Sequence, residues 1–194
     1  MKLLFVNACV RPQSRTLELC REYIALMKEK YENIEINELE LGKMDLRCFD
    51  YDMLCRRDRD IVAEDFSSER YDMAKAFAGA DIILIGAPYW DCSFPAVLKV
   101  FFEHISVNKL TFRYVGADCI SMCHAEKLCY ITTSGGYIGN RNSGERYISD
   151  MCSVFGIPQM QTVSAEGLDI YGNDVSAIMK EASKKMRQEL IPHK

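Results

Sequence analysis

Strand-like and helix-like hydrophobic patterns alternate five times along this chain, and this alternation restricts the possible folds more than any other feature. Five short segments are apolar throughout or alternate between apolar and polar residues, as β-strands do, at 2–7, 33–41, 81–87, 127–133 and 159–165. Apolar residues then recur at helical spacing within 20–31, 71–78, 95–105, 147–155 and 175–186. Five such units predict an α/β fold, a doubly wound parallel sheet with helices on both faces.

The order of the strands follows from their connections. Right-handed crossovers and a count of five strands favour the order 2-1-3-4-5. Strands 1, 3 and 4 are then neighbours, and sheets of this kind bind ligands beyond the carboxyl ends of the strands, where the order reverses. We expect residues 1–194 to form one domain, because a chain of this length accommodates one comfortably.

Turn residues and charges refine this prediction. Gly79 is expected to end the second helix, Pro95 to open the third, and Asn173 or Asp174 to cap the last. The segment 42–70 is different, because 14 of its 29 residues are charged and its apolar residues show no clear period. We expect a long surface excursion there, with at most fragments of helix.

Composition excludes several classes of protein. A net charge of −4 argues against a nucleic-acid-binding protein. The longest apolar runs, such as Ile82–Ile85, are too short to span a membrane, and no targeting segment is visible, which favours a cytoplasmic protein. The nine cysteines are odd in number and include no C-x-x-C pair, so reduced thiols are expected.

The loop after the first strand carries the residues of an anion site. The loop leads directly into the first helix and contains Arg11, Ser14, Arg15 and Thr16. It has no glycine, so it is neither a Walker loop nor a dinucleotide fingerprint. Free backbone N–H groups and the helix dipole favour a phosphate at such a helix start. The alternative is that Ser14 only caps the helix.

The loop after the third strand is stiff and aromatic. Pro88 and Pro95 enclose Tyr89, Trp90 and Phe94, and such a stretch can present an aromatic wall to a flat heterocycle. The alternative is that Trp90 and Phe94 are ordinary core aromatics beneath a loop.

The loop after the fourth strand contains paired glycines. Gly135 and Gly136 permit positive φ or a close approach of the backbone to a ligand, although a plain turn is the alternative. With three such loops on adjacent strands, we expect a pocket for one phosphate and one planar ring system, as in a mononucleotide such as FMN.

The stretch APYWDCSFPAVLKVFFEHI at 87–105, followed by LTFRY at 110–114, resembles the flavin-contact signature of the FMN-dependent NAD(P)H:quinone reductase and azoreductase family, which has a flavodoxin-like fold. Elements in the family's order cover roughly residues 2–165. The resemblance implies FMN as the cofactor, with its phosphate near Ser14, Arg15 and Thr16, its ring system against Pro88, Tyr89, Trp90, Asp91, Cys92, Ser93 and Phe94, and its pyrimidine edge near Ser134, Gly135, Gly136 and Tyr137.

The resemblance also implies a homodimer whose second subunit completes the substrate pocket, and Phe112 and Tyr114 are candidates to line it. Three positions depart from the family's pattern. Asp91 stands where asparagine is common, and its carboxylate would disfavour an anionic reduced flavin. Cys9 stands where a hydroxyl residue is often found, and we include it with Arg11 in the predicted cofactor site. Cys92 stands where relatives have aromatic residues.

The activity implied is that of an enzyme. NADH or NADPH would deliver a hydride to flavin N5, and a quinone, an azo compound or another small acceptor would then remove two electrons. The cofactor carries this chemistry, so no catalytic side chain is expected. Backbone N–H groups of Gly135 and Gly136 could stabilise charge that develops on the flavin.

Two other functions stay open. A flavodoxin is an electron carrier of the same fold, and direct reduction by NAD(P)H would distinguish the enzyme from it. An iron–sulfur flavoprotein is suggested by the cysteines, although their spacing lacks a compact ligand run, at Cys48, Cys55, Cys119, Cys123 and Cys129. A response-regulator receiver is a poor match, because Asn7 and Ala8 stand where it needs an acidic pair.

Overall fold

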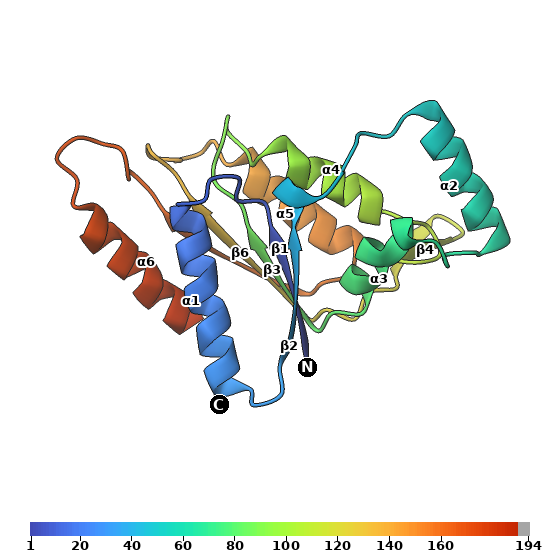
Figure 1. The fold of residues 1–194 in the computed structure, drawn as a ribbon, viewed down its shortest axis with the longest axis horizontal. Coiled ribbons are helices and arrows are strands. Elements are labelled where there is room, and N and C mark those ends of the chain that lie inside the picture. The colour runs from blue at the N-terminus through green and yellow to red at the C-terminus, as the bar shows by residue number, and fades with distance from the viewer. Residues whose placement is uncertain (190–194) are drawn as a thin grey trace.

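The computed structural model describes residues 1–189, and within them five parallel strands form one sheet in the order β2-β1-β3-β6-β7 (Figure 1). Strands β4 and β5 form a separate antiparallel hairpin, so this order is the predicted 2-1-3-4-5 once the hairpin is set aside. The predicted fold is confirmed. The strands are β1 (Lys2–Asn7), β2 (Glu35–Glu40), β3 (Ile82–Gly86), β4 (Phe112–Val115), β5 (Asp118–Ser121), β6 (Lys127–Thr133) and β7 (Gln159–Ala165).

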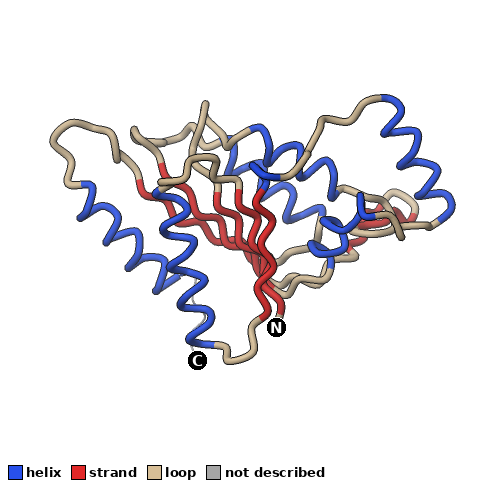
Figure 2. The backbone as a smooth tube through the Cα atoms, in the orientation of Figure 1, coloured by secondary structure: helices blue, strands red, loops and turns tan. Residues whose placement is uncertain are grey.

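Helices cover both faces of the sheet (Figure 2). The helices α1 and α6 lie on one face, and α3, α4 and α5 lie on the other (Figure 1). Short 3-10 turns at Leu41–Lys43 and Glu69–Tyr71 join the elements. The helices are α1 (Arg15–Lys30), α2 (Tyr51–Ala63), α3 (Asp72–Ala78), α4 (Ala96–Ile105), α5 (Ser143–Val154) and α6 (Val175–Glu189).

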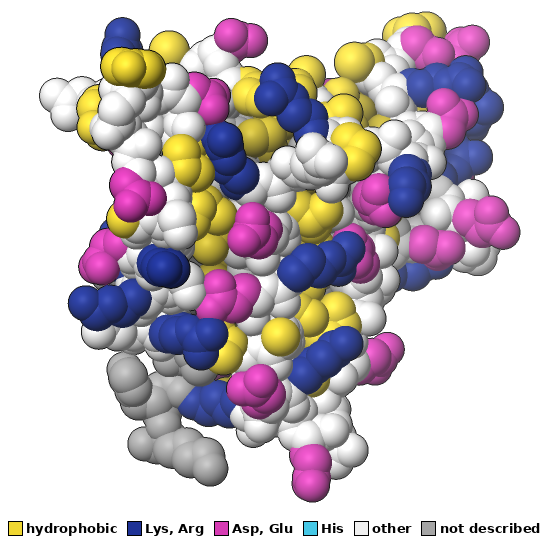
Figure 3. All heavy atoms as spheres, turned by 60° about the vertical axis from the view of Figure 1, so that its left-hand side comes forward, with side chains coloured by type: hydrophobic (Ala, Val, Ile, Leu, Met, Phe, Trp, Pro, Cys, Tyr) yellow, Lys and Arg dark blue, Asp and Glu magenta, His cyan; other side chains and the backbone are white. Residues whose placement is uncertain are grey.

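The alternation of side chains along each strand divides the core into two parts. In β1, Leu3 and Phe5 face α1 and α6, while Leu4 and Val6 face α3, α4 and α5. All four are buried because the central strands of a parallel sheet are covered on both faces. On the outer side of α1 and α6, basic and acidic side chains are interspersed among smaller apolar areas (Figure 3). The core therefore lies in two layers that hold the strand ends in register.

The predicted helix ends are largely confirmed. Helix α3 ends at Ala78 with Gly79 as its C-cap, and Pro95 directly precedes α4 as its N-cap. Of the two residues predicted to cap the last helix, Asp174 is the one that caps α6, because its Oδ1 accepts a hydrogen bond from the Ala177 N–H at 2.9 Å. Helix α5 begins at Ser143, ahead of its apolar stripe.

The prediction for segment 42–70 was wrong in one respect. It contains α2, a helix of 13 residues, rather than fragments. Asp50 caps it by accepting a hydrogen bond from the Met53 N–H at 2.7 Å. None of its residues is buried, although Ile61 packs, partly buried, against the core.

The hairpin of β4 and β5 was missed as well. Its strands have four residues each and pair Phe112 with Ser121 and Val115 with Asp118. Gly116 has φ +64° in the turn between them, a conformation that favours glycine. Strands this short carry too few residues to show an alternating pattern. Within residues 1–189, no helix is long and apolar enough to cross a membrane.

Candidate functional site

The loops at the carboxyl edge of the sheet are tied together by backbone hydrogen bonds that continue beyond the strands. The Ala8 N–H donates to the Gly86 oxygen at 2.9 Å, and the Tyr89 N–H donates to the Thr133 oxygen at 2.9 Å. The loops after β1, β3 and β6 are therefore held side by side, as the predicted strand order requires. Their geometry is set by the sheet rather than by the loops alone.

These loops enclose a cleft with a volume of about 430 Å³. This lies within the range of about 300–1,000 Å³ that is typical of small-molecule sites. Its lining comes from the three loops and from the segment after β7, and consists of Val10, Arg11, Gln13, Ser14, Arg15, Thr16, Pro88, Tyr89, Trp90, Thr133, Ser134, Gly135, Leu168 and Asp169.

One end of the cleft is the start of α1. The Ser14 hydroxyl oxygen accepts a hydrogen bond from the Leu17 N–H at 3.2 Å, so Ser14 does cap the helix. The Ser14 side chain also hydrogen-bonds the Cys9 thiol, which lowers the pKa of that thiol by less than burial raises it. Thr16 is buried and lies 2.7 Å from the Thr133 hydroxyl. Together with Arg11 and the helix dipole, this end provides donors and positive charge suited to a phosphate.

A polar network that runs from buried Asn7 to the exposed Arg21 fixes the beginning of this loop. The Cys9 N–H donates to Asn7 Oδ1 at 3.0 Å, and Asn7 Nδ2 donates to Glu38 at 3.0 Å. Arg21 in turn binds both oxygens of Glu38, at 2.6 and 2.7 Å. Burial raises the pKa of Glu38, but the hydrogen bonds from Arg21 and Asn7 outweigh it, so the pKa is lowered overall and the carboxylate stays ionised. Asn7 is thus locked in one orientation and holds the loop.

The predicted cofactor residue Cys9 lies beneath the cleft rather than in its lining. It is buried, and its Sγ faces the Gly86 oxygen at 3.6 Å. Burial raises the pKa of Cys9 to about 11. The side chain is therefore a neutral thiol at physiological pH and packs below the loop.

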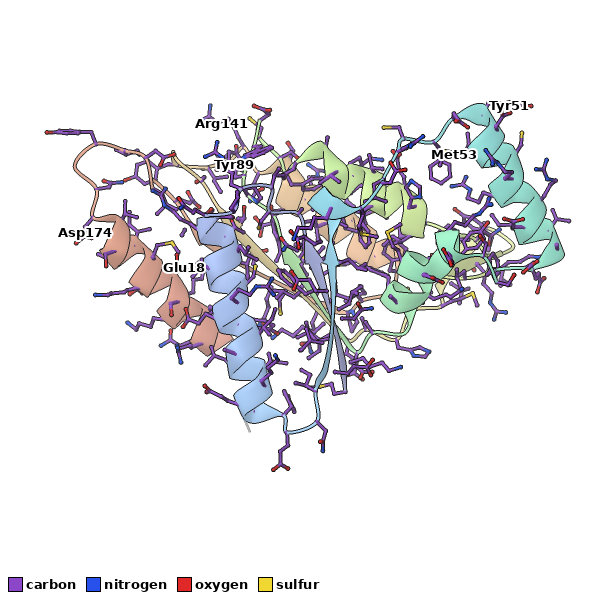
Figure 4. The ribbon with its side chains drawn as sticks, in the orientation of Figure 1. Glu18, Tyr51, Met53, Tyr89, Arg141 and Asp174 are labelled. Atoms are coloured by element: carbon purple, nitrogen blue, oxygen red, sulfur yellow. The ribbon has the colours of Figure 1, made fainter. Side chains whose placement is uncertain are left out.

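The other end of the cleft is aromatic. Trp90 is 38 % exposed, a large fraction for the chain's single tryptophan, and it lines the cleft with Tyr89 and Pro88. Tyr89 donates a hydrogen bond from its hydroxyl to the Arg141 oxygen at 2.8 Å, and the two residues meet at the upper edge of the molecule (Figure 4). This contact ties the loop after β3 to the segment before α5.

Residues Asp91 and Cys92 form a tight turn at the rim. Both have positive φ, 47° and 64°, which is uncommon for residues other than glycine. Trp90 and Ser93 close the turn with mutual backbone hydrogen bonds of 3.0 and 2.8 Å. Asp91 and Cys92 are exposed, and neither they nor Ser93 belong to the lining of the cleft.

The remaining predicted residues divide between the cleft and its surroundings. Ser134 and Gly135 line the cleft, whereas Gly136 and the exposed Tyr137 lie just beyond it. Phe94 is buried and its ring packs against Tyr147 with centroids 5.6 Å apart, so it supports the loop from within the core.

Phe112 and Tyr114 lie on β4, outside the lining of this cleft. Their rings meet edge to face with centroids 5.6 Å apart, and Tyr114 is 62 % exposed. Within one chain, the structure thus does not bring Phe112 and Tyr114 to the cleft.

Five lining residues were not among the predicted site residues. Val10, Gln13 and Thr133 lie in or next to the predicted loops, whereas the segment that contains Leu168 and Asp169 was not predicted at all. This segment follows β7, whose carboxyl end lies at the same edge of the sheet as the other loops. Asp169 forms an ion pair with Arg15 at 2.9 Å. The strand order could have indicated this segment, but its residues match no ligand-binding pattern.

All nine cysteines are free thiols, and four of them, Cys9, Cys20, Cys129 and Cys152, are buried. Across residues 1–189, His, Cys, Asp and Glu side chains form no group of three or more that could hold a metal ion.

The sequence of this chain matches known families over nearly its whole length. A family model described as flavodoxin-like fold matches residues 1–190. The FMN-dependent NADH:quinone oxidoreductase of Clostridium beijerinckii is 31 % identical, with 96 % of each chain covered. The protein of the same name from Lachnoclostridium phytofermentans is 30 % identical, with 95 % of each chain covered.

Solved structures agree on the fold. An azoreductase from Bacillus anthracis strain Sterne superposes with a TM-score of 0.85 at 23 % identity, covering 97 % of both chains. A FMN-dependent NADH-azoreductase from Bacillus anthracis strain Ames Ancestor, solved in complex with FMN, gives a TM-score of 0.84 at 19 % identity over 97 % of both chains.

Proposed function

This chain belongs to the flavodoxin-like fold family and, within it, to the FMN-dependent NADH:quinone oxidoreductases, and we propose that it is an oxidoreductase that uses FMN to pass electrons from NADH to a quinone or a similar small acceptor. The proposal rests on the cleft at the carboxyl edge of β1, β3 and β6, which has hydrogen-bond donors suited to a phosphate at one end and aromatic side chains at the other. The relatives' names favour this enzyme over an electron carrier.

The residues of the cleft fit FMN. Arg11, Ser14 and Arg15, with the free N–H groups of α1, would hold its phosphate. Tyr89 and Trp90 would flank its ring system, as the resemblance of the chain to the family implies. Gly136 has no atom within 4 Å of where a Cβ would lie, so its backbone is open to a ligand.

The overall reaction would move two electrons and two protons. NADH gives up a hydride and becomes NAD⁺, one proton comes from solvent, and the quinone becomes a hydroquinone. FMN, when bound, supplies the two-electron chemistry that connects donor and acceptor. The protein's own groups would bind and orient: the α1 terminus neutralises the phosphate, and backbone N–H groups near Gly135 and Gly136 would stabilise negative charge at the ring. Asp91 would oppose such charge if its carboxylate approached the ring.

A homodimer completes the proposal. Tyr114, Val115 and Ile120 expose apolar surface on the hairpin of β4 and β5, and Tyr51 and Val62 do so on α2. A second copy would cover part of this surface and bring Phe112 and Tyr114 to its partner's acceptor site. NADPH in place of NADH and azo compounds in place of quinones are further variants of the same proposal, as is a cytoplasmic location.

The visible spectrum tests the proposal. The purified protein would be saturated with FMN, desalted and then mixed anaerobically with NADH or, separately, NADPH. We expect retained flavin absorbance that bleaches with NADH and returns when a quinone is added. Retained flavin that neither nucleotide bleaches would favour the electron carrier, and a protein that retains no flavin would overturn the assignment of the site.

A further inference from the structure

The segment after β7 adds a fourth wall to the cleft and places a carboxylate in it. The backbone N–H groups of Gly167, Leu168 and Asp169 donate to the oxygens of Gly136, Ser134 and Gly135, at 3.1, 3.1 and 2.9 Å. The segment thus runs alongside the glycine turn and is fixed there. The position of the Asp169 side chain follows from this pairing.

The Asp169 carboxylate lies in space that the proposed ligand would need, and it pairs with the positive charge of Arg15 that the ligand's phosphate would use. Its Oδ1 accepts a hydrogen bond from Arg15 Nη1 at 2.9 Å, and the same nitrogen lies 3.4 Å from the Leu168 oxygen. Its Oδ2 lies so close to Gly135 that a Cβ added at Gly135 would overlap it. The carboxylate therefore engages both the arginine at the start of α1 and the glycine turn.

The pair of Arg15 and Asp169 is weak enough to be exchanged. The two side chains are 41 % and 72 % exposed, and ion pairs in contact with solvent contribute little stability. A phosphate dianion carries more charge and more acceptor oxygens than a carboxylate, so it makes stronger hydrogen bonds with a guanidinium. A phosphate at the α1 terminus would compete well for Arg15, but it must still displace Asp169 from it or bind beside a negative charge.

Given the proposed FMN site, on which this inference rests, we propose that Asp169 is an internal competitor for Arg15 that sets how tightly the cleft binds a phosphorylated flavin. It weakens the binding of FMN and leaves the binding of the phosphate-free flavin, riboflavin, unaffected. The cleft therefore prefers FMN over riboflavin by a smaller factor than it would if Asp169 did not compete for Arg15.

Titration of the flavin-free protein with FMN and with riboflavin, followed by flavin fluorescence at low ionic strength, tests this. Asp169→Asn should lower the Kd for FMN about fivefold and leave that for riboflavin within about twofold. The gain should shrink at about 0.5 M salt, because mobile ions screen exposed charges. Asp174→Asn is the matched control, since it removes the same charge at the start of α6, outside the cleft lining, and asparagine can still cap the helix (Figure 4).

A double-mutant cycle assigns the effect to Arg15. In an Arg15→Gln background, which itself should weaken the binding of FMN, Asp169→Asn should change the Kd for FMN by less than twofold. The inference is overturned if Asp169→Asn leaves FMN binding unchanged or weakens it, or if both flavins gain equally. A wild-type protein that binds neither flavin would instead refute the proposed function.

Discussion

The cleft and the segment that carries α2 are held in place by different means. The loops of the cleft continue the hydrogen bonding of the sheet, as between Tyr89 and Thr133, and they lie on strands that are buried on both faces. Helix α2 has no buried residue and stands apart from the other helices (Figure 1). One region is fixed by the central core, and the other by contacts between side chains at the periphery.

The contacts of α2 are few and leave space beneath it. The Phe49 ring contacts His104, with ring centroids 4.6 Å apart, and the Arg57 guanidinium lies over it at 4.8 Å from its centroid. Asp60 accepts a hydrogen bond from the Tyr71 hydroxyl at 2.8 Å. Cavities of about 200 and 500 Å³ both border Phe49 and Arg57. In Figure 4, Tyr51 lies at the upper, N-terminal end of the helix, and Met53 borders the smaller of these cavities.

Local stability should therefore fall sharply from the cleft to α2. Regions with little buried apolar surface open with a small free energy, whereas core strands open only with the whole protein. Matched changes under the cleft and in or next to α2 can measure this difference in stability.

The largest effect is expected from truncating one isoleucine in each region. Ile85 of β3 is fully buried, and Ile61 of α2 is partly exposed. Ile85→Ala should lower the free energy of unfolding by about 2–5 kcal/mol, because it leaves a cavity in the core, and Ile61→Ala by about 1 kcal/mol or less. Urea denaturation measures both. Equal losses would show that α2 belongs to the cooperative core.

A second contrast concerns thiols. The pKa of Cys9 is raised to about 11 by burial, whereas Cys48, next to α2, is exposed. Since the thiolate is the nucleophile and its fraction rises with pH, about one Cys9 thiol in a thousand is ionised at pH 8. Iodoacetamide should therefore modify Cys9 at least about a hundredfold more slowly than Cys48, as mass spectrometry of the native protein can measure. Urea should abolish the difference. Comparable rates in the native protein would mean that the loop after β1 opens freely.

The smallest effect is expected at the two helix caps. Ser14 caps α1 and Asp50 caps α2. Ser14→Ala should lower the free energy of unfolding by about 1 kcal/mol and raise the Kd for FMN about fivefold. The substitution removes both the helix cap and a hydrogen-bond donor to the phosphate. Asp50→Ala should only fray α2, with less than about 0.5 kcal/mol of change in global stability and an unaltered Kd for FMN. Calorimetry and flavin titration test both. A matching loss of FMN binding in Asp50→Ala would connect α2 to the cleft.

The same difference explains what the sequence could predict. The run DIILIGA at 81–87 predicted a strand buried on both faces. The number of strand-like segments and the handedness of their connections predicted the strand order, and with it the edge where Ser14, Trp90 and Gly135 meet. Helix α2 has no buried residue and lies in a segment dense in charged residues, which predicted a surface excursion but not a helix of 13 residues.

Details within the cleft depended on tertiary contacts. Asp169 enters the cleft through backbone pairing with the Ser134–Gly136 turn, which no local pattern encodes. Phe94 and Cys9 have the residue types expected at a ligand, yet they pack beneath it, because position along a loop does not determine on which side of the loop a side chain lies.

Amide hydrogen exchange, compared between flavin-free and FMN-saturated protein, tests most directly whether the cleft is the flavin site. The account predicts slower exchange on FMN binding in peptides that cover 8–17, 87–93 and 133–138, from the three loops that line the cleft together. Unchanged exchange in all three, with protection elsewhere in the chain, would contradict it.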